Sequence, residues 1–185
     1  NGAGGNYVLS LTNFEVKNMF RRMIQGWFGN ASVRYNDFIK ALLSDDIDYM
    51  NQYMNQVALQ TFSFFDTGKK PADQEEPERF YHGFVLGLMV ELADKYRITS
   101  NRESGLGRYD IVLEPLKKNE MAYVIEFKVH KPKREKDLQE TAENALRQIE
   151  EKNYDAELLA RGIQKEQIRH LGFAFSGKRV LIEQG

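Results

Sequence analysis

The stretch GRYDIVLEPLKKNEMAYVIEFKV constrains the fold most, because it predicts two β-strands joined by a polar turn. Alternation along the second strand places Glu126 and Lys128 on one face and the apolar side chains on the other. Along the first strand, Tyr109 and Ile111 share one face and Asp110 takes the other. If the two strands pair, Asp110 lies beside Glu126. The sequence therefore predicts two carboxylates and an ammonium group close together on neighbouring strands.

These three side chains suit the hydrolysis of a phosphodiester. That reaction needs charge neutralisation on the non-bridging oxygens, an activated water and a stabilised leaving alkoxide, all of which divalent cations can supply. Mg²⁺ prefers oxygen ligands and keeps several waters, so two carboxylates and one carbonyl are enough protein for it. Asp110 and Glu126 are the predicted ligands of Mg²⁺ or Mn²⁺, with the Phe127 carbonyl as a third candidate. Lys128 is predicted to hold or help deprotonate the attacking water.

The order of these residues resembles the PD-(D/E)XK nuclease superfamily, in which an Asp on one strand precedes Glu-x-Lys on the next. The wider string is similar to the nuclease-like domain at the C-terminus of a family of bacterial AAA-ATPase-like proteins, and the resemblance runs over nearly the whole chain. The motifs that carry it are Glu78, Phe80, Tyr81 and His82 on one helix, then SNRESGLGRYDIVL, YVIEFKV and ALRQIEEKNY.

The resemblance implies a restriction-endonuclease-like core and the same catalytic roles for Asp110, Glu126 and Lys128. It implies nucleic acid, with DNA expected, as the substrate. It also implies a covalently linked AAA-type ATPase domain outside this sequence, because the chain as given contains no phosphate-binding GxxxxGK[ST] loop.

Five further residues enter the predicted site, three of them, Glu78, Gln148 and Tyr154, through the resemblance. The superfamily often places a helix glutamate near the metal, which makes Glu78 a fourth catalytic candidate. His82, one helical turn on, is expected to touch phosphate or to orient Glu78. Gln148 and Tyr154 resemble the Gln and Tyr of the motif in RecB-type members, which support substrate or the active-site lysine. Arg108 is expected to pair with an acidic residue or to reach a phosphate.

Each assignment has a structural alternative, and the sequence leaves these alternatives open. The Glu-x-Lys pattern is also that of a surface ion pair on an edge strand. The helix glutamate and histidine have the spacing of an ordinary helix-surface pair. The glutamine and tyrosine after the second strand are also candidates for a purely structural role.

Three other positions bear on the site. Tyr109 stands where the superfamily signature has Pro, a position at which RecB-type members vary. Glu114 shares a face with Asp110, but four residues of extended strand place it roughly 13 Å away, so it is left out of the site. The basic segment 131–136 is typical of a solvated helix start, and it also lies where it would contact a nucleic-acid backbone.

The remaining periodicity predicts an α/β fold, in which a mixed sheet flanked by helices follows a small N-terminal helical subdomain. Residues 1–70 are expected to form that subdomain or a linker to a missing N-terminal domain, and residues 71–185 the nuclease-like domain. Phe84 and Leu88 are expected to face inward from the helix that begins at Pro77. The strands at 122–129 and 168–175 flank a helix and predict a parallel βαβ crossover. Other expected elements are helices over 12–29, 35–43, 45–58 and 135–152, strands at 96–99 and 179–182, and a turn over 100–107.

Composition narrows the function further. The chain has 185 residues, no cysteine and a net charge of −1, which excludes disulfides and thiolate metal sites and makes any nucleic-acid contact local. No apolar run approaches the roughly 18 residues of a membrane span, so a cytoplasmic protein without membrane contact is expected. Two other functions stay open. One is a catalytically silent nuclease-fold module that binds nucleic acid or a partner on behalf of an attached ATPase, and the other is a structural interaction domain.

Overall fold

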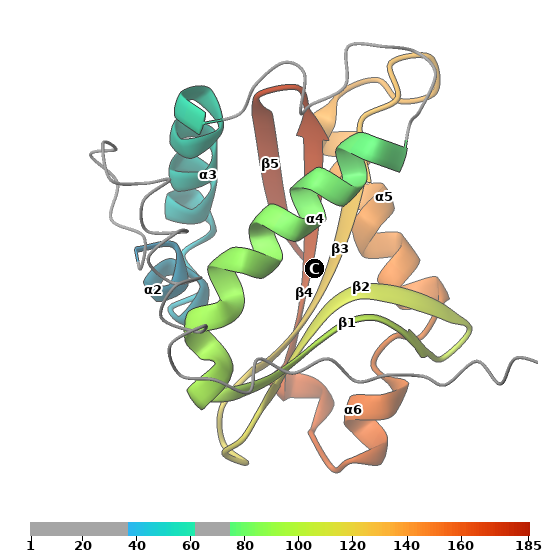
Figure 1. Cartoon of the computed structure of the whole chain (residues 1–185). Helices are drawn as coiled ribbons and strands as arrows, with labels where there is room; N and C mark the ends of the chain where they lie inside the picture. Colours follow the sequence, from blue (N-terminus) through green and yellow to red (C-terminus); the bar gives the residue numbers. More distant parts are fainter. Residues whose placement is uncertain (1–36, 62–74) are drawn as a thin grey trace, which may run out of the picture.

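A computed structural model describes residues 37–61 and 75–185 of the chain. At its centre is a five-stranded mixed sheet whose strands follow one another across the sheet in chain order (Figure 1). β3 and β4 pair in parallel, as the βαβ prediction requires, and the other neighbouring pairs are antiparallel. The strands are β1 (Tyr96–Ser104), β2 (Gly107–Pro115), β3 (Ala122–Val129), β4 (Ile168–Ser176) and β5 (Arg179–Gln184).

Helices cover both faces of this sheet (Figure 1). One face carries α2 (Asp37–Leu43), α3 (Ile47–Thr61), α4 (Glu75–Met89) and the 3₁₀ helix η1 (Val90–Asp94). The other face carries α5 (Leu138–Glu151) and α6 (Ala156–Ala160), and the 3₁₀ turn η2 (Lys165–Gln167) leads into β4. The α/β class, the mixed sheet and the N-terminal helical part are therefore confirmed. Within the described ranges, no helix combines the length and the hydropathy needed to cross a membrane.

Alternation along the strands divides their side chains between two cores. Ile111 on β2 packs into the core beneath α2, α3 and α4. Val112 and Tyr154 belong to the second core, on the side of α5 and α6, and Tyr109 packs with them. The prediction that Tyr109 shares a face with Ile111 is therefore wrong, because β2 departs from regular alternation at Asp110, where its pairing with both neighbouring strands is interrupted.

The turn between β1 and β2 is shorter than predicted. β1 extends to Ser104, so Gly105 and Leu106 alone reverse the chain and the predicted turn over 100–107 is wrong. Gly105 has a φ of 58°, and a Cβ at this position would lie 2.2 Å from the Lys152 carbonyl oxygen. The Leu106 N–H donates to that same oxygen at 2.7 Å. The hairpin tip is thus tied to the end of α5, which fixes the position of β2.

The inward face of α4 agrees in part with the prediction. Leu88 is buried and Phe84 packs, partly buried, against the same core, as expected. Tyr81 and Met89, which the prediction does not place on that face, are buried completely. The Tyr81 ring stacks on Phe175 with ring centroids 4.0 Å apart, and its hydroxyl donates to the Gly177 carbonyl at 2.6 Å. The helix is therefore oriented by a tyrosine that needs a polar partner, which the spacing of apolar residues does not reveal.

The start of α5 also differs from the prediction. Asp137 is the N-cap and accepts the Glu140 N–H at 3.0 Å, so the helix begins at Leu138 rather than at residue 135. The basic segment 131–136 consequently precedes the helix and forms a loop.

Helix α3 covers the outer edge of β5. Asn51 donates to the Ile182 carbonyl at 2.8 Å and accepts the Ile182 N–H at 2.7 Å. Asn55, one turn on, makes the same pair of bonds with Val180, at 2.7 and 3.0 Å. The two amides therefore act as the missing neighbour of an edge strand. The predicted helix over 12–29 and the domain boundary at residue 70 lie outside the described residues and stay predictions.

Candidate active site

The candidate site lies where strands β2 and β3 separate. The last paired residues of their ladder at this end are Ile111 and Ile125. Continuing the register places Asp110 opposite Glu126, and there the Asp110 carboxylate, rather than a backbone carbonyl, accepts the Phe127 N–H at 2.8 Å. The separation of the strands makes room for the two acidic side chains between them.

Asp110 and Glu126 lie close together. Their carboxyl groups interact with each other, and Glu126 is only 3% exposed. Burial raises the pKa of Asp110, against the lowering effects of the Phe127 N–H, the Lys128 charge and the Glu126 contact. Two carboxyl groups this close do not both ionise unless a proton or a cation offsets their repulsion.

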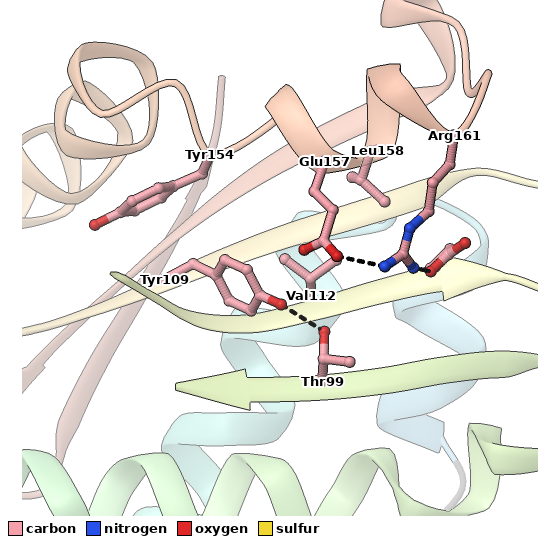
Figure 2. A pocket seen from close by; sticks show the side chains of 8 residues that line it. Thr99, Tyr109, Val112, Tyr154, Glu157, Leu158 and Arg161 are labelled. Carbon is pink, nitrogen blue, oxygen red and sulfur yellow. Dashed lines mark hydrogen bonds and ion pairs between the residues drawn. The ribbon is translucent and has the colours of Figure 1, made fainter. Parts of the chain in front are cut away.

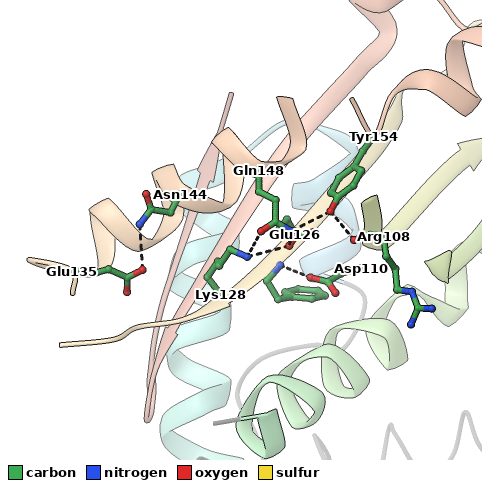
Figure 3. Close-up of polar contacts among 9 residues, drawn as sticks. Arg108, Asp110, Glu126, Lys128, Glu135, Asn144, Gln148 and Tyr154 are labelled. Carbon is green, nitrogen blue, oxygen red and sulfur yellow. Dashed lines mark hydrogen bonds and ion pairs between the residues drawn. The ribbon is translucent and has the colours of Figure 1, made fainter. Parts of the chain in front are cut away.

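Lys128 and Gln148 complete a polar network around Glu126 (Figure 3). The Lys128 ammonium lies 3.3 Å from Glu126 Oε1 and also donates to Gln148 Oε1. The Gln148 amide nitrogen donates to Glu126 Oε1 and to the Tyr154 hydroxyl, the latter at 3.1 Å. Tyr154 in turn donates to the Arg108 carbonyl at 2.7 Å. Because the Gln148 carbonyl oxygen accepts from Lys128 and its amide nitrogen donates to Glu126 and Tyr154, the orientations of the Gln148 amide and of Lys128 are fixed.

The close approach of α5 to the sheet makes this network geometrically feasible. Gly172 on β4 is the parallel partner of Glu126, directly beneath α5. A Cβ at Gly172 would lie 2.5 Å from the Ala142 carbonyl oxygen and 3.1 Å from Leu146 Cγ. Glycine thus lets the helix lie close enough for Gln148 to reach the glutamate.

The predicted residue His82 lies on the α4 side of the site, among residues of β1. Its Nε2 is 2.8 Å from Ser100 Oγ, and its Nδ1 is 3.3 Å from the Asn101 amide. The His82 ring also packs against Phe127, with centroids 5.5 Å apart. Asn101 has a φ of 52° and stands opposite Asp110, a position where backbone strain is common near functional groups.

Ser100 and Asn101 are the two polar neighbours that the sequence reasoning missed. Both belong to the segment SNRES, whose polar composition predicts a turn, whereas the structure forms a strand there.

Two further predicted residues have no described side-chain contact with this network. The Arg108 side chain is exposed and makes no ion pair with any residue that the structure describes, while its carbonyl accepts from Tyr154. Glu78 lies in α4, one turn before His82, and its side chain is outside the described part of the structure. Glu114 is held by Arg161 and, at 3.2 Å, by Arg97.

A pocket lies beside the network, on the side of α6 (Figure 2). Tyr154 lines it together with Tyr109, whose hydroxyl is 2.8 Å from Thr99 Oγ1. Both acidic side chains in the pocket, Glu114 and Glu157, are paired with Arg161. The carboxylates of the pocket are therefore neutralised within the protein by Arg161, whereas Asp110 and Glu126 have Lys128 as their nearby cation.

The donor set fits a hard divalent cation. Among the described residues, no three His, Cys, Asp or Glu side chains gather closely enough to hold a metal by themselves. Mg²⁺ in proteins is commonly held by one or two carboxylates, with water and substrate phosphate completing its shell. Asp110 and Glu126 provide two such carboxylates close to each other, and they are the residues that would hold such a cation.

Comparison with known proteins identifies the family of the chain. The family model of the PD-(D/E)XK nuclease superfamily matches residues 76–185, from α4 to the last residue. Members of this superfamily generally use divalent metal ions. Searches of curated proteins and of solved structures found no match. The match spans more than half of the chain and includes every residue of the network, so the chain belongs to the PD-(D/E)XK nuclease superfamily.

Proposed function

We propose that this chain is a metal-dependent nuclease domain that hydrolyses phosphodiester bonds, with DNA as its substrate. One observation carries the proposal. The carboxyl groups of Asp110 and Glu126 interact where two strands separate, and the Lys128 ammonium lies 3.3 Å from Glu126. A surface ion pair does not need a second, partly buried carboxylate beside it, so the purely structural alternative accounts for Asp110 only through the Phe127 N–H that it accepts.

Each residue has a distinct role in this proposal. Asp110 and Glu126 bind Mg²⁺ or Mn²⁺, which when bound supplies charge neutralisation at the phosphate and favours ionisation of water. Lys128 donates to the attacking water or to a phosphate oxygen and stabilises negative charge as it develops. Gln148 orients Lys128 through its carbonyl oxygen, and Tyr154 orients Gln148. These contacts hold the lysine in one position without any substrate contact of their own.

The substrate side of the proposal rests on residues at the border of the site. His82 and Arg108 remain proposed phosphate contacts, and Glu78 a proposed fourth catalytic residue. An attached AAA-type ATPase domain also remains part of the proposal, because it would explain how a nuclease domain is brought to its substrate. A cytoplasmic location follows from the same proposal.

Cleavage of labelled oligonucleotides tests the function. Single- and double-stranded DNA and RNA would be incubated with the protein and Mg²⁺ or Mn²⁺, comparing the wild type with Asp110→Ala and Lys128→Ala. We expect DNA cleavage by the wild type and a loss of at least about 100-fold in each variant. Glu143→Ala, an exposed change on α5, serves as the control that should cleave like the wild type.

Two other outcomes would decide against the proposal. Cleavage that survives both Asp110→Ala and Lys128→Ala would indicate a contaminating enzyme. No cleavage by any of the proteins, together with retained binding of nucleic acid, would favour a silent module that serves an attached ATPase.

A further inference from the structure

The loop between β3 and α5 is unusually rich in exposed cations. This basic loop, residues 131–136, follows directly from the strand that carries Glu126 and Lys128. Its only acidic residue, Glu135, is turned inward, so that its side chain is 11% exposed. The exposed basic residues of the loop are Lys131, Lys133, Arg134 and Lys136.

Glu135 holds the backbone of the basic loop in place. Its Oε2 accepts the Lys131 N–H at 2.7 Å and the Thr141 hydroxyl at 2.9 Å. Its Oε1 accepts from the Asn144 amide at 3.2 Å, the contact drawn in Figure 3. His130 Nδ1 lies 3.4 Å from the same carboxylate. Burial acts to raise the pKa of Glu135, but these contacts outweigh it and hold the pKa below its ordinary value. The carboxylate therefore stays ionised and connects the loop to α5.

The cations of the basic loop are not neutralised by neighbouring acids. Within the described residues, none of the four side-chain cations lies within 4.0 Å of a carboxylate oxygen, and the one acid of the loop is used internally. Several basic residues elsewhere on the described surface are paired, namely Lys40 with Asp37, Arg97 with Glu114, Arg161 with Glu157 and Arg169 with Asp45. A loop with a fixed backbone and unpaired cations is suited to bind an extended polyanion.

The position of the basic loop relates it to the candidate active site. Lys131 follows Lys128 by three residues, so at most about 10 Å of chain separates them. One strand of a nucleic acid rises about 3.4 Å per nucleotide in a duplex. The loop is therefore within reach of phosphates a few nucleotides from one bound at Asp110 and Glu126.

We propose that the basic loop binds the phosphate backbone of the nucleic acid beside the scissile bond, independently of base sequence, and that Glu135 is the positioning residue for this contact. The inference rests on the proposed nuclease function and extends it by locating the substrate strand. Lysine ammonium groups contact phosphates as point charges and do not distinguish one base from another. This contact therefore sets the affinity for the nucleic acid and its position along the site, and not sequence specificity.

Binding of a fluorescein-labelled 20-nucleotide single-stranded DNA, followed by fluorescence anisotropy in EDTA, tests the loop without any cleavage. The loop variant is Lys131→Ala, Lys133→Ala and Lys136→Ala combined. The matched control combines Lys95→Ala, Lys117→Ala and Lys118→Ala, three exposed lysines at the opposite end of β2 and β3. Both variants lose three positive charges, so any difference between them reports position rather than net charge.

We expect the loop variant to bind about tenfold or more weakly at moderate salt, and the slope of log affinity against log salt to fall in magnitude by about 2. The control should change affinity by no more than about twofold. Equal losses in the two variants, or unchanged binding by the loop variant, would overturn the proposal.

Replacement of Glu135 by alanine tests its positioning role, because the change makes the net charge more positive and removes the contact with the loop backbone. Glu135→Ala and Glu143→Ala both remove one negative charge near the N-terminal part of α5, but only Glu135 contacts the loop backbone. If charge alone mattered, both variants would bind DNA more tightly. We expect Glu135→Ala to bind at least about threefold more weakly than Glu143→Ala, with thermal melting confirming that both are folded at the assay temperature. Binding by Glu135→Ala equal to that of Glu143→Ala, or tighter, would contradict the positioning role.

The failure of this inference is distinguishable from the failure of the nuclease function. If the wild type cleaves DNA and the loop variant binds and cleaves identically, the function stands and the loop proposal fails. If the loop variant loses binding but no protein cleaves with either metal, the loop proposal stands and the nuclease proposal fails.

Discussion

At the scale of single residues, the site places two carboxyl groups close together, an arrangement that is unfavourable when both are ionised. Asp110 and Glu126 are brought together and largely buried, and burial raises the pKa of Asp110. The alternation of side chains and the Asp, Glu-x-Lys order indicate these positions in the sequence. The resemblance indicates Gln148 as a support for substrate or the active-site lysine, but no local pattern shows its contact with Lys128, which depends on the packing of a helix distant in the sequence.

Substitution of Asp110 should separate stability from activity. Because the folded-state pKa of Asp110 is raised, the native state holds its proton more tightly than the unfolded chain. Its contribution to stability is therefore fully present below the unfolded pKa and is lost as pH rises through the folded pKa. Asp110→Asn keeps an acceptor for the Phe127 N–H and can donate to Glu126, so it should raise the free energy of unfolding at pH 7 by about 1 kcal/mol in metal-free buffer.

Chemical denaturation in EDTA between pH 4 and pH 8 measures this effect. The gain of Asp110→Asn over the wild type should shrink toward pH 4, and the variant should not cleave DNA at any pH. A variant less stable than the wild type at pH 7 would show that the acidic pair is not strained.

At the scale of elements, the distance between α5 and the sheet determines whether the network can form. Gly172 permits this close approach. The amphipathic pattern of α5 and the apolar strands around it predict that the helix covers the sheet. The sequence could not reveal which glycine lies under the helix, because that depends on the parallel register between β3 and β4.

Gly172→Ala should disturb both stability and the site. A methyl group 2.5 Å from a backbone oxygen forces α5 away from the sheet, which we expect to lower the free energy of unfolding by about 1–3 kcal/mol. Gln148 moves with the helix, so cleavage should also fall. Gly83→Ala is the matched control, because a Cβ at Gly83 meets no atom within 4 Å and alanine favours the helix.

Urea denaturation and the cleavage assay, applied to both glycine variants, test this account. Gly83→Ala should be as stable as the wild type or more stable, with unchanged cleavage. Equal behaviour of the two variants would show that the contact beneath α5 is not tight.

At the scale of the whole molecule, the N-terminal helices and the sheet share one core. Residues of α2 and α3 pack with those of β4 and β5, although more than 100 positions separate them along the chain. The sequence predicts the helices from their apolar spacing, but the match between two asparagines and the edge of β5 is a long-range contact. Such contacts have no local signal.

Asn51→Ala should expose this edge. The Ile182 N–H and carbonyl lose their partners, so we expect a loss of about 2 kcal/mol in the free energy of unfolding and a stronger tendency to associate. Gln52→Ala, an exposed change on the same helix, should have little effect. Denaturation together with light scattering at increasing protein concentration measures both effects, and indistinguishable variants would contradict the edge-covering role.

The central claim, that Asp110 and Glu126 together hold a divalent cation, is tested most directly by Mn²⁺ binding followed by electron paramagnetic resonance. The account predicts saturable binding to the wild type that Asp110→Asn and Glu126→Gln each weaken at least about tenfold, while the exposed change Glu143→Gln leaves it unchanged. Equal Mn²⁺ binding by all four proteins would contradict the claim.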